Sequence, residues 1–179
     1  MTQVVSRTDS DGYEHQICAQ SHMNSCAMAS LFMLECIKKS MSMDGGEERL
    51  WYLSGQFAGH FSGVDGTLWD NVVRVLAKLQ INPAGWDETD VENEGTGQTI
   101  RPSYIGMQRP ALVGIGWWGV GPKGWTRFGG HMVLARWMTD DRGKVVFLDP
   151  YKGQLVERVN DGSFRSRSGS GLIETVMYT

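Results

Sequence analysis

The chain is organised around the stretch Gln20-Ser21-His22-Met23-Asn24-Ser25-Cys26-Ala27-Met28-Ala29-Ser30, which opens an apolar segment that continues to Lys39 without glycine or proline. Asn24 and Ser25 are residue types that cap helices, so the sequence predicts a helix that begins at Cys26. Apolar residues surround most of its circumference, which predicts a helix in the centre of the core. A thiol in a first helical turn lies where unpaired backbone N–H groups and the helix dipole favour a thiolate. Cys26 is therefore a candidate nucleophile.

Composition and charge limit the classes of protein to which this sequence can belong. Its 179 residues, 41% hydrophobic and 21% charged, suffice for one globular domain with a sizeable core. The formal net charge of −3, with no cluster of lysine and arginine, predicts no nucleic-acid partner. The longest apolar run, Ala111–Trp118, is too short to span a bilayer, so no membrane insertion is expected. The N-terminus lacks the apolar centre of a cleaved signal peptide. This predicts a cytoplasmic protein, or one delivered to a target cell by a route that needs no such signal.

Helical patterns occupy the first half of the chain and strand patterns the second. The first 13 residues are polar and are expected to be poorly ordered. After the helix that begins at Cys26, residues 47–53 predict a short helix and residues 66–80 a capped amphipathic one. Five later apolar or alternating runs predict strands: Ala111–Trp118, Met132–Met138, Lys144–Leu148, Gln154–Val159 and Leu172–Tyr178.

The segments between these elements predict how they connect. Residues 82–103 show little periodicity and predict a connecting segment between a helical half and a strand half. Hairpin turns are predicted at 140–143 and 151–153, and a flexible surface loop at 163–171. Helices followed by antiparallel strands are typical of an α+β domain. We therefore expect one domain over residues 14–179, with a helical lobe at about 14–82 and a β lobe at about 104–179.

The three cysteines, Cys18, Cys26 and Cys36, cannot all pair with one another and lie too close in sequence for a disulfide framework. Cys18 and Cys36 are expected to be small buried apolar residues. A cysteine thiol has an ordinary pKa of about 8.5, so Cys26 needs a neighbouring imidazole to take its proton.

Four histidines are candidates for that base. His15 lies in the polar N-terminal region, and His60 lies in a glycine-rich loop that it is expected to brace. His22 is close to the thiol in sequence but has no nearby carboxylate to orient it. His131 follows two glycines and is expected to open a strand, and the next strand ends in Asp149. Because a carboxylate there can hold the imidazole in the correct tautomer, we predict a triad of the thiol, His131 and Asp149.

The turn that joins the two strands decides whether His131 and Asp149 share a face of the sheet. A two-residue turn places them on opposite faces, whereas a three-residue loop over 141–143, with Gly143 left-handed, places them on the same face. Even that register leaves Asp149 some positions away along the strand. A bulge or a looser turn is a way to bring the two side chains together.

Two further residues complete the predicted site. Acyl transfer develops negative charge on a carbonyl oxygen, and the side-chain amide of Gln20, beside the backbone N–H of Cys26, is a candidate donor to it. Tyr151 follows Asp149 by two residues and is expected to cover the contact between this carboxylate and His131. The segment from Gly116 to Gly130, rich in glycine and tryptophan, is expected to border the cleft, with a lid and a simple core or rim position as its alternative roles.

The order of these residues resembles that of the papain-like cysteine peptidase superfamily. The family order is Gln, Cys, His, then Asn or Asp, and Gln20, Cys26, His131 and Asp149 match it, including the spacing from the glutamine to the cysteine. The surrounding sequence is more similar to two bacterial branches, the peptidases that trim double-glycine leaders and the papain-like effector proteases of plant-pathogenic bacteria. The resemblance covers residues 16 to 158. Papain's own neighbourhood of Gly-Ser-Cys-Trp is absent, and the sequence is shorter between its cysteine and histidine than that of papain.

This resemblance implies a helical lobe led by the cysteine helix and packed on an antiparallel sheet or partial barrel, with the active site between them. It implies that Cys26 attacks a peptide carbonyl, that His131 carries the proton and that Asp149 orients the imidazole. Gln20 and the Cys26 N–H are then expected to hold the oxyanion. The expected partner is a polypeptide substrate, with no cofactor and no metal, in a reducing environment; an activating partner is left open.

Three other interpretations stay open at this point. The same triad serves amide deamidation and acyl transfer. Cys18, His22 and Cys26 are spaced four and four, so on a continuous helix they would line one face and could hold zinc. A non-catalytic binding module with the same fold is the third.

Overall fold

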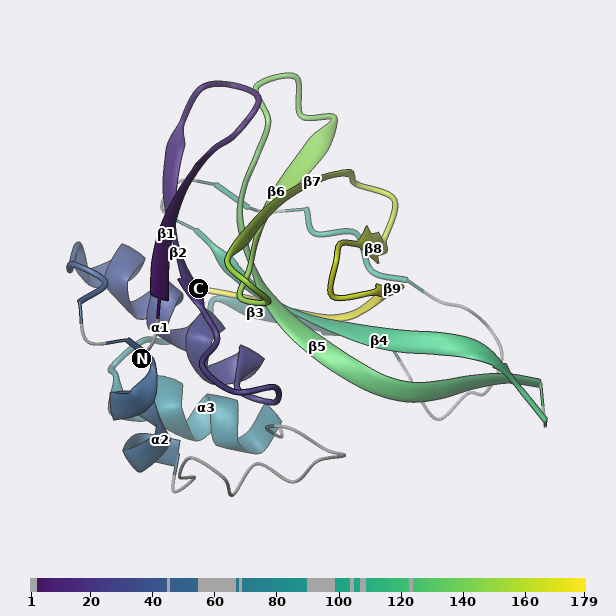
Figure 1. Ribbon diagram of the computed structural model, residues 1–179, viewed down its shortest axis with the longest axis horizontal. Coiled ribbons are helices and arrows are strands. Elements are labelled where there is room, and N and C mark those ends of the chain that lie inside the picture. Colours follow the sequence, from purple (N-terminus) through teal and green to yellow (C-terminus); the bar gives the residue numbers. More distant parts are fainter. Residues whose placement is uncertain are drawn as a thin grey trace.

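The computed structural model describes residues 3–44, 46–54, 67, 69–89, 99–103, 105–106, 109–122 and 124–179. Within them, three helices pack against a mostly antiparallel β-sheet, so the protein has the α+β architecture that its sequence predicts (Figure 1). His60 lies outside the described residues.

The helices have close to the predicted bounds. α1 (Cys26–Lys39) begins and ends as predicted, and its residues from Ala27 to Cys36 are all buried, which confirms a helix in the centre of the core. α2 (Glu48–Ser54) and α3 (Trp69–Lys78) flank it. Ser30, on α1, donates a hydrogen bond to the carbonyl oxygen of Met132 at 3.1 Å, so the helix is tied to the strand that carries His131.

The sheet contains seven strands among the described residues, and every pair in it is antiparallel. Its order is β3-β9-β4-β5-β6-β7, and β8 also pairs with β9. The bounds are β3 (Gly85–Glu88), β4 (Ala111–Gly121), β5 (Gly124–Met138), β6 (Lys144–Asp149), β7 (Gln154–Val159), β8 (Ser163–Arg165) and β9 (Ser170–Tyr178). The sheet curls so that β7 approaches β8, where the Arg158 Nε donates to the Arg165 carbonyl oxygen at 2.7 Å.

Alternating side chains of the central strands form two cores. Leu112, Leu134 and Leu148 pack with the helices, whereas Val113 and Val133 belong to a second core on the other face. This alternation follows from the strand period of two and places α1 against one face of β5.

Two strands lie where the sequence predicts none. β1 (Gln3–Thr8) pairs with β2 (Glu14–Ala19) along its whole length, so the expectation of poor order over residues 1–13 is wrong for residues 3–8. β3 lies inside the segment 82–103 that was expected only to connect the two halves, and it pairs with the C-terminal strand β9. Both strands are largely exposed, so their side chains show no burial pattern and backbone pairing holds them.

The hairpins differ from the predictions in length and turn geometry. β4 and β5 continue past Trp118 and before Met132, and form the long two-stranded ribbon that projects from the body in Figure 1. His131 therefore lies within a strand and does not open one. In the turn between β5 and β6 the left-handed residue is Arg142, at φ 54°, and not Gly143. Residues 163–171, expected to be a loop, contain β8 and the start of β9.

None of the helices in the described part of the protein is long and apolar enough to cross a bilayer.

Candidate active site

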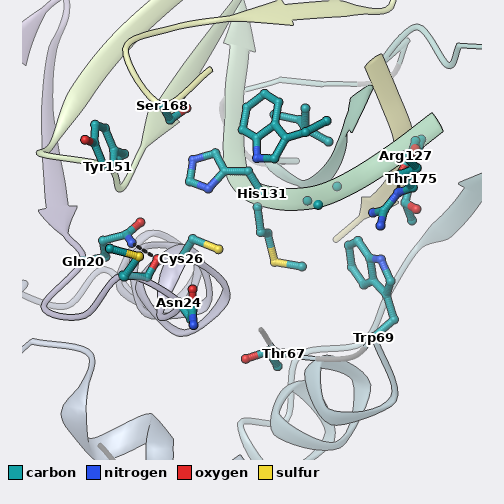
Figure 2. A pocket seen from close by; sticks show the side chains of 18 residues that line it. Gln20, Asn24, Cys26, Thr67, Trp69, Arg127, His131, Tyr151, Ser168 and Thr175 are labelled. Carbon is teal, nitrogen blue, oxygen red and sulfur yellow. Dashed lines mark hydrogen bonds and ion pairs between the residues drawn. The ribbon is translucent and has the colours of Figure 1, made fainter. Parts of the chain in front are cut away.

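Cys26 and His131 meet where the first turn of α1 faces β5. Hydrogen bonding and charge between the His131 imidazole and the Cys26 thiol shift the pKa of both groups, and Figure 2 shows the two side chains as neighbours in the pocket. Ser25 precedes the helix at φ −97°, and helix geometry leaves the N–H of Cys26 without an intrahelical acceptor. The predicted nucleophile and base are thus in contact.

The surroundings of the sulfur favour the thiolate. Burial acts to raise the pKa of Cys26, but the hydrogen bond and charge of His131 and the backbone N–H groups of Met132 and Ala27 outweigh it, so the pKa lies below its ordinary value. Burial raises the pKa of Cys36 to about 11 and also raises that of Cys18, as expected for buried apolar cysteines.

His131 is held on its other side by Asp149. Its Nε2 donates to Oδ1 of Asp149 at 2.7 Å, which leaves Nδ1 as the ring atom that faces Cys26. Burial alone would lower the pKa of His131, but the hydrogen bonds and charges of Asp149 and Cys26 raise it to about 10. These two shifts favour a resting pair of thiolate and imidazolium.

A β-bulge brings Asp149 to the same face of the sheet as His131. Near the turn the pairs of β5 with β6 are Met138–Val145 and Trp137–Val146; past Arg136 they become Ala135–Phe147 and Leu134–Leu148. The extra residue, Arg136, shifts the register by one and so reverses the face of every side chain beyond it. With the turn alone, His131 and Asp149 would lie on opposite faces of the sheet. Of the two possibilities that the sequence analysis named, a bulge or a looser turn, the structure contains the bulge.

Two serines that the sequence did not identify support Asp149, whose side chain is fully buried. Ser166 Oγ donates to Asp149 Oδ2 at 2.7 Å and Ser168 Oγ lies 3.1 Å from the same oxygen. The backbone N–H of Tyr151 donates to Oδ1 at 2.8 Å. The segment expected to be a flexible loop therefore contributes to the site. In the sequence, only the serine-rich composition of this segment pointed to a role in the site. The contact with Asp149 could not be predicted, because it depends on the pairing of β8 with β9.

Trp117 covers the imidazole. Its ring stacks on that of His131 with centroids 5.7 Å apart and an interplanar angle of 18°. From the sequence, Tyr151 was expected to provide this cover; Tyr151 lines the pocket and contributes its backbone N–H to Asp149. Trp117 belongs to the segment that was expected to border the cleft, and it lines the pocket.

Gln20 lies beside the nucleophile, but both hydrogens of its amide have acceptors within the protein. Its Nε2 donates to the carbonyl oxygens of His22 at 2.8 Å and Met23 at 2.7 Å. Its backbone N–H donates to the carbonyl oxygen of Pro150 at 2.8 Å, which ties this loop to the turn after Asp149. In this conformation Gln20 orders the loop before α1 and offers no free donor to an oxyanion.

The same loop rests on a buried carboxylate that the sequence did not identify. Glu47 Oε1 accepts from Ser21 N at 2.8 Å, from Ser21 Oγ at 2.5 Å and from Ser25 Oγ at 2.6 Å. The side chain is fully buried, and burial raises the pKa of Glu47 against these hydrogen bonds. No sequence signal connects Glu47 with the loop, since the contact depends on the path between α1 and α2.

Cys26 and His131 line a pocket of about 490 Å³, drawn in Figure 2. Its lining is Gln20, Met23, Asn24, Cys26, Thr67, Trp69, Gly114, Ile115, Trp117, Arg127, Gly129, Gly130, His131, Met132, Tyr151, Ser168, Glu174 and Thr175. In Figure 2, Cys26 and Gln20 lie on one side of the pocket, and Trp69, Arg127 and Thr175 lie on the other.

His15 and His22 have structural surroundings. His15 is buried, and its Nε2 lies 2.9 Å from Asp9 Oδ2, which also accepts from Trp137 Nε1 at 3.1 Å. His15 is thus part of a buried pair, although the N-terminal sequence around it is polar. His22 is exposed and packs against Trp51 at 5.0 Å between centroids.

The spacing of Cys18, His22 and Cys26 does not correspond to one helix. Cys18 lies on β2, His22 lies in the loop and Cys26 begins α1. Among the residues that the structure describes, no group of three His, Cys, Asp or Glu side chains is arranged to hold a metal ion.

Comparison of the sequence with protein-family models and with curated proteins finds no match.

Proposed function

We propose that the protein is a cysteine peptidase of the papain-like type that hydrolyses peptide bonds through Cys26, His131 and Asp149. The proposal rests on one observation: the His131 ring, which hydrogen-bonds to buried Asp149 at 2.7 Å, also interacts with the Cys26 thiol and lowers its pKa, at the edge of an open pocket. The order Gln, Cys, His, Asp and the cysteine helix packed on an antiparallel sheet also support it.

In the proposed reaction the Cys26 thiolate adds to the carbonyl carbon of a peptide bond. The carbonyl electrons move to oxygen, where the N–H of Cys26 is the donor that helix geometry leaves available. His131 then gives its proton to the amide nitrogen, the C–N bond breaks, and a thioester of Cys26 is left.

The second half of the reaction restores the enzyme. Neutral His131 takes a proton from water as the water oxygen adds to the thioester carbon, and the C–S bond breaks to release a carboxylic acid and the Cys26 thiolate. Asp149 holds the imidazole throughout, and Trp117 shields one face of the ring from water. Gln20 joins the oxyanion site in this proposal only if substrate displaces its bonds to the His22 and Met23 carbonyl oxygens.

The proposal is tested by mass spectrometry of new N-termini in a cell extract treated with the wild-type protein or with Cys26→Ala. We expect peptides that appear only with the wild type, and brief iodoacetamide treatment that labels Cys26 much faster than Cys18 or Cys36. His131→Ala is expected to remove that difference in labelling. Ammonia release, or acyl transfer to an added amine, without new N-termini would replace peptidase by deamidase or acyltransferase. Equal labelling of the three cysteines with no chemistry at all would reject an enzyme.

A further inference from the structure

The end of the pocket away from Gln20 holds an ion pair that the triad does not use. Arg127 Nε donates to Glu174 at 3.1 Å from Oε1 and 3.0 Å from Oε2. The Glu174 side chain is 7% exposed, whereas that of Arg127 is 41% exposed, and both residues line the pocket. The acid is therefore enclosed and the cation is open to the cleft.

The backbone makes room for this pair. Glu174 is the extra residue of a bulge, because Gly114 pairs with Thr175 while Ile115 pairs with Ile173. A Cβ at Gly116 would lie 1.8 Å from Glu174 Oε1, so only glycine at that position allows the carboxylate its present place.

The Glu174 carboxylate accepts hydrogen bonds from two side chains of the protein, those of Arg127 and Trp118. Its Oε1 also accepts from Trp118 Nε1 at 2.7 Å, so indole and guanidinium hold the carboxylate from two sides. A substrate cation would have to displace Arg127 to reach it. The open charge at this end of the pocket is accordingly the positive one.

The Arg127 guanidinium keeps most of its hydrogen-bonding capacity. Arginine carries five N–H donors in a rigid fork, and Glu174 engages only the one on Nε. Among the described residues no acceptor is hydrogen-bonded to its Nη1 or Nη2. The side chain lies over the backbone of Gly130, where Nη2 would be 2.8 Å from an added Cβ. Figure 2 shows Arg127 beside Trp69 and Thr175, across the pocket from Cys26.

We propose that Arg127 binds a carboxylate of the polypeptide substrate, presented either by an Asp or Glu side chain near the scissile bond or by the C-terminus of the substrate. A planar fork of Nη1 and Nη2 matches a carboxylate with two parallel hydrogen bonds, which are stronger and more directional than those of a lysine. Glu174 is the positioning residue, because it holds the guanidinium by Nε and turns the other donors toward the cleft. This inference rests on the proposed peptidase function for the identity of the ligand.

The test measures binding apart from catalysis, with Cys26→Ala protein and fluorescent hexapeptide pools. One pool set is amidated at the C-terminus and fixes Glu or Gln at each position in turn; another fixes Gln and carries either a free carboxylate or an amide. We expect one Glu pool, or the free-acid pools, to bind about tenfold more tightly than the matched neutral pools. The set that responds identifies the source of the carboxylate.

Three variants assign the effect to the guanidinium. Arg127→Gln is expected to abolish the preference, and Arg127→Lys, which retains a cation for Glu174, is expected to weaken it severalfold while keeping the melting temperature. Arg158→Gln is the matched control, because Arg158 is exposed, donates by Nε to a carbonyl oxygen and lies outside the pocket lining, so it should keep the full preference.

The outcomes separate this inference from the proposed function. Equal binding of Glu and Gln pools and of acid and amide pools, or tighter binding of Lys pools, overturns the carboxylate site even if Cys26-dependent cleavage is found. A carboxylate preference that depends on Arg127, without cleavage, supports the site and rejects the peptidase.

Discussion

Nε2 of His131 lies 2.7 Å from Oδ1 of Asp149 because one extra residue, Arg136, stands between them in the β5–β6 hairpin. Without that bulge the register beyond the turn would carry the imidazole to the opposite face of the sheet. The bulge therefore places the proposed base, His131, and the acid that orients it, Asp149, on the same face of one hairpin. Bulges beside active sites commonly aim a side chain in this way.

The chemical character of Asp149 gives the first prediction. Asp149→Ala removes the acceptor of the His131 Nε2–H, and we expect Cys26-dependent cleavage to fall roughly 100-fold or more. Asp149→Asn should lose only about tenfold, because an amide oxygen can accept from His131 and Tyr151 while its nitrogen donates to the serine hydroxyls. In an ion-pair resting state both ring nitrogens are protonated, so no tautomer is lost. Steady-state kinetics on one cleaved peptide checks this, and equal losses in the two variants would contradict it.

The pH dependence of alkylation follows from the shifted pKa values. Alkylation requires thiolate, the pKa of Cys26 is lowered, and the pKa of His131 is raised to about 10. Cys26 should therefore react at about pH 6, below the ordinary range for a thiol, while Cys36 stays protonated because its pKa is raised to about 11. Loss of the His131 proton near its own pKa leaves Cys26 as a thiolate, so its rate should change little across the intervening pH range instead of rising steadily with pH.

Iodoacetamide rates for each cysteine, measured by mass spectrometry across this pH range, test the prediction. In His131→Ala the Cys26 rate should rise with pH as for an ordinary thiol, about tenfold per pH unit in the mildly acidic range. A wild-type Cys26 profile that follows this same course would show that no ion pair forms.

Hydrophobic periodicity accounts for how much of this molecule could be predicted. α1, buried from Ala27 to Cys36, and the central strands carry dense apolar patterns, and their predicted positions are confirmed. β1 and β3 are exposed strands held by backbone pairing, β3 with a strand at the far end of the sequence, so no local pattern marks them.

Part of the candidate site could likewise be predicted from the sequence, and part could not. Cys26 at a helix start, and His131 and Asp149 on neighbouring strands, could be predicted because hairpin topology forces the strands together. The bulge at Arg136 and the support of Asp149 by Ser166 could not, since both depend on register and on pairing between β8 and β9.

The serine support of Asp149 leads to the third prediction. In Ser166→Ala combined with Ser168→Ala, Oδ2 of the buried Asp149 loses both hydroxyl partners, which should cost about 1–3 kcal/mol of stability and lower cleavage severalfold. Ser163→Ala is the control, since its hydroxyl bonds only to exposed Asp161 at 2.6 Å and should change neither. Chemical denaturation and kinetics measure the two effects. Unchanged activity in the double variant would show that Asp149 needs no support from this segment.

The buried Glu47 gives the fourth prediction, because it carries the loop that precedes the nucleophile. Glu47→Ala removes the acceptor of the Ser21 N–H and hydroxyl and leaves the Ser25 hydroxyl only the His22 carbonyl oxygen, so we expect a loss of about 1–3 kcal/mol and faster amide exchange over residues 20–26. Glu47→Gln keeps an acceptor oxygen and matches the neutral acid that the raised pKa favours, so it should remain close to the wild type. Exposed Glu88→Ala on β3 serves as the control.

Hydrogen exchange with mass spectrometry measures the amide protection of the loop, and the rate of iodoacetamide labelling measures the effect of the loop on Cys26. If Glu47 positions the loop, Glu47→Ala should slow labelling at Cys26 and shift its pH profile toward that of an ordinary thiol, because the first turn of α1 no longer meets His131 in a fixed place. A purely structural role would lower the denaturation midpoint and leave that profile unchanged. Because Glu47→Gln keeps an acceptor oxygen but cannot ionise, a loss in this variant equal to that of alanine would mean that the loop requires the ionised carboxylate.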